Sequence, residues 1–123
     1  MIKSILMVGL GGGAGSMLRY ISYRWIYNIY PHPFPLGTFL VNITGCLLIG
    51  ILYSLSEKSA ILNPEWRLLL MTGICGGFTT FSAFTLEGIG LLKDNKPGLL
   101  FLYIAASVLT GLLATYIGIR LAK

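Results

Sequence analysis

The chain has 123 residues, of which 55% are hydrophobic and only 11% are charged. A soluble domain carries about 25% charged residues, and a chain of this size has too much surface to leave so little of it charged. Together with a mean hydropathy of +0.80, this composition excludes a soluble enzyme and a disordered chain, and it predicts an all-α integral membrane protein. The nine Lys and Arg residues form no basic cluster, so we expect them to flank membrane spans rather than to bind nucleic acid.

Charged residues and prolines divide the chain into four predicted helices. Four long segments lack Asp, Glu, Lys and Arg, and a membrane span needs about 20 mostly apolar residues. The second of these segments is too long for one span, and the run of prolines at 31, 33 and 35 divides it, because proline ends helices. We therefore predict a single domain over 1–123 with four transmembrane helices. They cover about 2–27, 36–56, 66–92 and 97–121.

The distribution of basic residues gives little preference for one orientation. With four spans, one side carries five basic residues, namely Lys3, Lys58, Arg67, Arg120 and Lys123. The other side carries Arg24, Lys93 and Lys96, and also Arg19 if its side chain reaches the interface. Because this bias normally sets topology, the chain is able to insert both ways and to form an antiparallel, dual-topology homodimer. A single orientation stays open, since one or two charges can suffice to set it.

Two polar residues stand out in the first two helices. Arg19 lies near one end of the first helix, where it is expected either to extend to the interface or to have a buried, anion-attracting role. Asn42 lies near the middle of the second helix, with Thr38 one turn earlier on the same face. The Asn42 amide can donate hydrogen bonds to an anion. A hydrogen bond between helices is the equally open alternative.

The third helix contains the densest group of polar and glycine residues. Residues 76–85 read GGFTTFSAFT. Adjacent glycines weaken a helix, and Ser and Thr compete for its backbone groups, so we predict a break here. A break at membrane depth frees carbonyl oxygens, which can bind a cation. A kink softened by glycine is the alternative.

Further candidates follow the predicted break. Phe81 and Phe84 share a helical face, and the electropositive edges of their rings could guide an anion, although ordinary packing is the simpler interpretation. Glu87 is the one acidic residue within a predicted span, and either a functional or an interfacial position is open. Ser107 lies on a polar stripe of the fourth helix between Tyr103 and Thr110. The sequence contains no nucleophile motif, metal-ligand cluster or paired carboxylates, so no enzyme is predicted.

Three motifs resemble those of the small bacterial fluoride channels known as the Fluc or CrcB family. Residues 11–20 (GGGAGSMLRY) are similar to the GGxxGAxxRY motif of the first helix in that family, with Ser16 at the usual alanine. Residues 37–45 (GTFLVNITG) resemble the GTxxVNxxG motif of its second helix. Residues 76–84 (GGFTTFSAF) resemble GGFTTFSTF, with Ala83 where a hydroxyl residue is common. The resemblance covers nearly the whole chain.

The resemblance implies an antiparallel homodimer in the bacterial plasma membrane, with two fluoride pathways along the subunit interface. In such a dimer, Asn42 donates to fluoride and Phe81 and Phe84 line the pathways. The resemblance also implies a central structural sodium ion, bound by the backbone carbonyls of Gly76 and Thr79 from both subunits. Further pathway residues carried over from the family are Thr38, Ser107 and Glu87.

The function expected from this resemblance is passive, fluoride-specific efflux that lowers cytoplasmic fluoride. A small multidrug-resistance-type antiporter is an alternative with four helices, but it requires a glutamate within the first helix, where this chain has no acidic residue. A non-transporting membrane scaffold would account for the abundant glycines. It would not account for the asparagine, the predicted break and the phenylalanine pair together.

Overall fold

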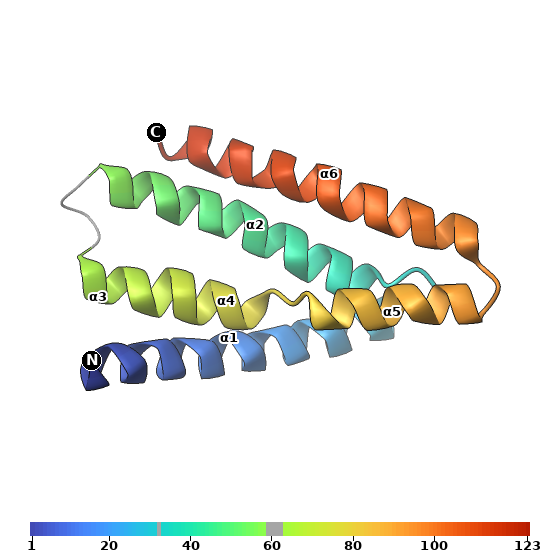
Figure 1. The fold of residues 1–123 in the computed structure, drawn as a ribbon, viewed down its shortest axis with the longest axis horizontal. Coiled ribbons are helices and arrows are strands. Elements are labelled where there is room, and N and C mark those ends of the chain that lie inside the picture. The colour runs from blue at the N-terminus through green and yellow to red at the C-terminus, as the bar shows by residue number, and fades with distance from the viewer. Residues whose placement is uncertain (32, 59–62) are drawn as a thin grey trace.

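The computed structural model describes residues 1–31, 33–58 and 63–123, and the regular structure in these ranges is entirely helical (Figure 1). His32 and the middle of the polar loop between the second and third predicted helices lie outside them. The predicted four-helix arrangement is confirmed, and the ends of each helical segment differ from the prediction by two residues at most. The segments are α1 (Ile2–Ile29), α2 (Leu36–Glu57), a third one made of α3 (Pro64–Arg67), η1 (Leu68–Cys75), α4 (Gly76–Phe78) and α5 (Ser82–Lys93), and finally α6 (Pro97–Leu121).

Local residue chemistry explains where the later helices begin. The side chain of Asn63 caps α3 by accepting a hydrogen bond from the Trp66 N–H at 2.9 Å, and Pro64 occupies the first helical position. Pro97 likewise occupies the first helical position of α6, which has no side-chain cap. Asn95 has a φ of 59° in the turn between α5 and α6, a left-handed conformation that asparagine tolerates better than most residues. The tight turn makes α5 and α6 antiparallel neighbours.

Three helical segments are long and apolar enough to cross a membrane, namely Leu36–Glu57, Pro64–Lys93 and Pro97–Leu121. The chain is therefore a multi-pass membrane protein. α1 has 28 residues, which also exceeds the length of a span, but its glycines and Arg19 make it less apolar. It nevertheless runs along the bundle, so the N- and C-termini lie at the same end (Figure 1). This arrangement is consistent with the prediction that α1 is the fourth span.

Glycines bring α1 into backbone contact with the third segment. A Cβ at Gly11 would lie 2.8 Å from the Cα of Gly73, and a Cβ at Gly15 would collide with the carbonyl oxygen of Ile74. From the other side, a Cβ at Gly77 would collide with the carbonyl of Gly12. In a bilayer, where apolar burial does not drive helix association, such close approach maximises van der Waals contact. These glycines therefore hold α1 against η1 and α4.

A second close pair consists of α2 and α6, which lie side by side in Figure 1. A Cβ at Gly50 would collide with the carbonyl of Thr115. Two hydroxyls also bridge the helices. The Ser54 hydroxyl donates to the Ile119 carbonyl at 2.9 Å, and that of Thr115 donates to the Cys46 carbonyl at 3.1 Å. Each such bond in a membrane contributes about 1 kcal/mol.

The third segment contains a feature that the sequence analysis did not predict. Leu68–Cys75 forms a π-helix of eight residues rather than a continuation of α3. π-Helical turns are rare and frequently occur at functional sites. The apolar run LLLMTGIC gives no pattern that distinguishes it from an α-helix. This π-helix packs along α1, and it leads directly to the break.

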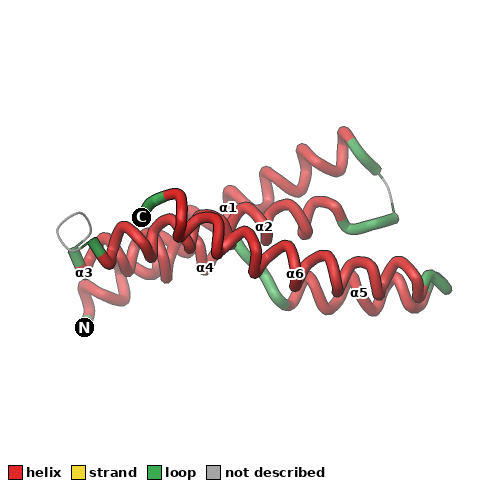
Figure 2. The backbone as a smooth tube through the Cα atoms, turned by 90° about the horizontal axis from the view of Figure 1, so that it is seen from above, coloured by secondary structure: helices red, strands yellow, loops and turns green. Residues whose placement is uncertain are grey.

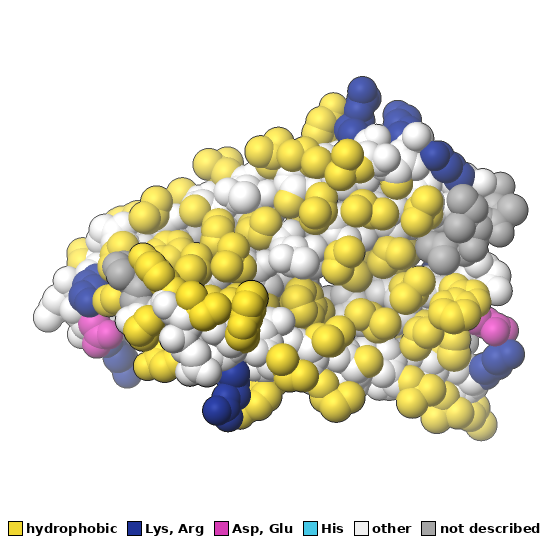
Figure 3. All heavy atoms as spheres, turned by 180° about the vertical axis from the view of Figure 1, so that it is seen from behind, with side chains coloured by type: hydrophobic (Ala, Val, Ile, Leu, Met, Phe, Trp, Pro, Cys, Tyr) yellow, Lys and Arg dark blue, Asp and Glu magenta, His cyan; other side chains and the backbone are white. Residues whose placement is uncertain are grey.

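The outer surface and the ends of the bundle differ in character. Hydrophobic side chains cover most of the face seen in Figure 3, and the charged side chains lie mainly towards its two ends. Such a surface suits a lipid environment. At one end the bundle forks. The end of α1 with the start of α2 diverges there from α5 and the start of α6 (Figure 2).

Candidate functional site: a broken helix and its groove

The predicted break in the third segment lies between Phe78, where α4 ends, and Ser82, where α5 begins. Thr79 is extended, with φ −84° and ψ 158°. The Thr80 N–H, which in a continuous helix would bond the carbonyl of Gly76, instead donates to the Asn42 side chain. The Ala83 N–H, which would bond the carbonyl of Thr79, donates to the Thr80 hydroxyl at 3.2 Å. The break therefore releases the carbonyls of Gly76 and Thr79 from helical bonding by these donors.

Asn42 clamps the break from α2. Its Oδ1 accepts from the Thr80 N–H at 2.8 Å, and its Nδ2 donates to the Thr80 carbonyl at 3.0 Å. The hydrogen bond between helices that the sequence left open is therefore present, and it goes to the backbone. An asparagine amide has two N–H donors. Since the structure shows one bond from Nδ2, the second donor is left for another acceptor.

A groove of about 570 Å³ opens beside the clamp, between α2, the broken segment and α6. It brings together six of the eight residues predicted for the site, namely Asn42, Gly76, Thr79, Phe81, Phe84 and Ser107. Residues that are far apart in the sequence, from position 42 to position 107, thus lie together in this groove. Phe81 is 76% exposed, so the groove lies open on the surface of the single chain.

The other two predicted residues, Thr38 and Glu87, lie in a separate hollow of about 670 Å³ within the fork. The Thr38 hydroxyl donates to Oε1 of Glu87 and is almost completely buried. The structure therefore pairs these residues, but it places them away from the main groove. Glu87 is half-buried and bonded to another helix, which favours a specific structural or functional position over a purely interfacial one.

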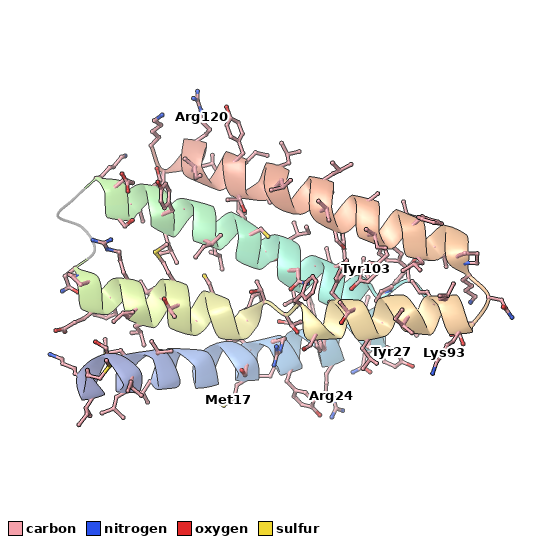
Figure 4. The ribbon with its side chains drawn as sticks, viewed as in Figure 1. Met17, Arg24, Tyr27, Lys93, Tyr103 and Arg120 are labelled. Atoms are coloured by element: carbon pink, nitrogen blue, oxygen red, sulfur yellow. The ribbon has the colours of Figure 1, made fainter. Side chains whose placement is uncertain are left out.

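Aromatic rings connect the groove to this hollow. The Phe81 and Phe84 ring centroids are 5.8 Å apart, and Phe84 lies 4.9 Å from the ring of Tyr103. Tyr103 is fully buried and also meets Phe34 edge-on at 5.4 Å. Figure 4 shows Tyr103 in the interior between the helices. The sequence analysis placed Tyr103 on a polar stripe but did not predict its contact with the phenylalanine pair.

Three buried hydroxyls lie around the groove and the hollow within the fork, and they have no hydrogen-bond partner among the described residues. They belong to Tyr23, Tyr103 and Ser107. An unsatisfied buried hydroxyl costs about 1–3 kcal/mol, so these groups indicate a place for water or a ligand that accepts hydrogen bonds. Tyr23 was missed by the sequence analysis, because nothing in α1 alone indicates that its hydroxyl turns inward.

Arg19 lies in a third hollow of about 390 Å³ that also contains Ser16, Thr80 and Ser82. Its side chain is only partly exposed. Of the two positions left open by the sequence, the structure therefore favours a hollow shared with hydroxyl groups over full extension to the interface. The Arg19 side chain in this hollow places a positive charge near the break.

The fold and the groove define a class of protein. A helix that is broken at membrane depth beside a groove is a feature of several transport folds. Residues 6–119 match the family model described as CrcB-like protein, Camphor Resistance (CrcB). The chain belongs to the CrcB family, and this membership implies a transporter rather than an enzyme.

Individual relatives match almost end to end. The chain is 47% identical over 122 residues to the fluoride-specific ion channel FluC of Flavobacterium psychrophilum, covering 99% of this chain and 98% of that one. It is also 47% identical over 122 residues to the fluoride-specific ion channel FluC of Phocaeicola vulgatus, covering 99% and 100%. The protein of the same name from Leptospira interrogans is 38% identical over 121 residues, covering 98% and 95%.

Proposed function

We propose that this protein is a fluoride-specific ion channel that lowers cytoplasmic fluoride by passive efflux across the cell membrane. The observation that carries the proposal is the groove in which a spare Asn42 N–H, the unpartnered Ser107 hydroxyl and the Phe81–Phe84 pair come together. These groups donate hydrogen bonds or present electropositive ring edges, so they suit a small anion. The names and extent of the matching relatives support fluoride as that anion.

The proposed mechanism needs no energy source beyond the membrane potential. A potential negative inside drives an anion outward with about 2.3 kcal/mol per charge per 100 mV. Selective conduction requires donors strong enough to replace the water around fluoride and weak enough to release it. Neutral donors such as an amide and hydroxyls meet both conditions better than a fixed positive charge would.

We further propose that two copies assemble as an antiparallel homodimer of dual topology. In the single chain the groove is open and Phe81 is largely exposed, so one wall of a closed pathway is still required. A second copy would supply that wall. The nearly balanced distribution of basic residues supports insertion in both orientations.

A structural sodium ion fits the residues at the break. In a continuous helix the carbonyls of Gly76 and Thr79 would accept from the Thr80 and Ala83 N–H groups. Here these N–H groups donate to Asn42 and to the Thr80 hydroxyl instead. Among the described residues, no group of three His, Cys, Asp or Glu side chains could hold a metal ion. A cation here would therefore bind to backbone oxygens, which suit a hard ion, and two copies would double the set. The bound ion would supply positive charge that stabilises the broken segments.

We expect sodium to stabilise the purified protein against heat. A ligand at about one hundred times its Kd adds about 2.7 kcal/mol to the free energy of unfolding. The Tm should therefore rise by several degrees when sodium replaces N-methylglucamine at constant ionic strength. Potassium serves as the matched inorganic control. Equal Tm values in all three cations would contradict the sodium site.

The main test of the proposed function is anion efflux from liposomes that contain the purified protein. Wild type should release fluoride rapidly and chloride hardly at all. Phe81→Ile should slow fluoride efflux by about 100-fold, equivalent to about 2.7 kcal/mol of barrier, because an alkyl side chain has no electropositive ring edge.

Phe101→Ile provides the control for this substitution. Phe101 is 72% exposed on α6, close to the exposure of Phe81, but it does not line the groove. The Phe101→Ile variant should therefore conduct like the wild type. If folded, sodium-supplied wild type releases no fluoride, the channel proposal is wrong.

A further inference from the structure

The first helix contributes an inward-facing hydroxyl whose role the proposed function leaves unexplained. The side chain of Tyr23 is half-buried, and its ring packs against α2, where a Cβ at Gly37 would lie 3.4 Å from Cδ1. Its hydroxyl oxygen is completely enclosed, and it has no hydrogen-bond partner in the described part of the chain. By contrast, Tyr27, one turn later, is 68% exposed at the edge of the bundle (Figure 4).

Tyr23 stands between two hollows of opposite charge. It lines the hollow that contains Glu87 and also the hollow that contains Arg19. Thr38 lines the first of these hollows together with Tyr23 and Glu87. An anion moving between these two hollows would therefore pass close to the Tyr23 hydroxyl.

A second phenol approaches the same place from the opposite side of the bundle. Tyr103 on α6 is fully buried, and its hydroxyl is also unpartnered among the described residues. Its ring contacts Phe34, which lines the hollow that contains Tyr23, Thr38 and Glu87. Its ring contacts Phe84, so this cluster continues directly from the phenylalanine pair. Four helices, α1, α2, α5 and α6, thus converge on one polar point.

The chemistry of this point calls for strong donors. Glu87 already accepts a bond from Thr38, and its carboxylate would repel an anion nearby. Phenol hydroxyls are more acidic than those of Ser or Thr and therefore donate more strongly. Two phenol hydroxyls beside this hollow would offset the repulsion from a single carboxylate.

We propose that Tyr23 is a fluoride-binding residue, and that its hydroxyl and that of Tyr103 form a station beside the Thr38–Glu87 pair. The first helix then lines the ion pathway in addition to packing against η1. This inference rests on the proposed channel function and adds to it a donor from α1 and a position within the fork.

The test compares Tyr23→Phe with Tyr116→Phe in the liposome efflux assay. Both changes remove one hydroxyl and keep the ring, but Tyr116 is 59% exposed and lines none of the three hollows. Loss of one donor should slow fluoride efflux by about 5- to 10-fold in Tyr23→Phe. Tyr116→Phe should conduct at the wild-type rate.

A second measurement separates binding from a structural effect. In protein labelled with ¹³C at the tyrosine Cζ atoms, the resonance that is missing from Tyr23→Phe should shift when fluoride is added, and chloride should leave it unchanged. A wild-type rate in Tyr23→Phe would overturn the inference, and so would slower efflux without any fluoride-dependent shift. If wild type itself does not conduct fluoride, the proposed function fails and the station fails with it.

Discussion

Replacing Asn42 with Asp is expected to reduce fluoride efflux by about 1,000-fold, or about 4 kcal/mol of barrier. Aspartate keeps the shape of the side chain, and one carboxylate oxygen can still accept from the Thr80 N–H. The other oxygen would face the Thr80 carbonyl, where Nδ2 now donates at 3.0 Å. The variant thus loses the spare N–H donor and adds a negative charge beside the proposed anion path. Liposome efflux measures the effect.

The same chemical change outside the membrane provides the control. Asn95→Asp alters the turn between α5 and α6, and aspartate tolerates the left-handed conformation found there. This variant should conduct like the wild type. Rapid efflux through a folded Asn42→Asp protein would show that this side chain is not needed as a donor. Loss of efflux with assembly intact would count against a non-transporting scaffold.

Gly15→Ala is expected to destabilise the fold strongly for so small a change. The added Cβ would collide with the carbonyl oxygen of Ile74 and lie 2.8 Å from the Phe78 nitrogen. Both contacts are with backbone, which cannot move aside as a flexible side chain would. Overpacking of this kind costs about 1–3 kcal/mol, and α1 would have to move away from η1. Thermal unfolding in detergent should show a Tm several degrees below that of the wild type.

Gly13→Ala makes the identical substitution two residues earlier. A Cβ at Gly13 would meet nothing within 4 Å, and alanine favours a helix over glycine by about 1 kcal/mol. This variant should therefore be as stable as the wild type or slightly more so. Equal Tm values for both variants would mean that α1 does not approach η1 as closely as the structure shows.

The number and limits of the helical segments follow from the sequence because their causes are local. Prolines remove backbone donors, and charged residues other than Arg19 and Glu87 are largely kept out of the spans, so both mark segment ends within a few residues. The break near Thr79 was predicted for the same reason, since adjacent glycines and hydroxyl residues weaken a helix wherever they occur. The π-helix before it was not predictable, because its apolar residues would suit an α-helix equally well.

The sequence, read with its family resemblance, also predicted Asn42, Phe81, Phe84 and Ser107 as pathway residues, because polar groups and clustered motifs are conspicuous in apolar helices. It did not determine which partners they have. Only the tertiary structure decided that the Asn42 amide binds the backbone of the broken helix, and that Thr38 pairs with Glu87 in a separate hollow. Likewise, the tertiary structure alone turned the hydroxyl of Tyr23 inward. Hydrogen-bond partners between helices depend on how closely the backbones approach and how the helices are rotated. Both are set by glycine contacts between segments far apart in the chain, which no local pattern reveals.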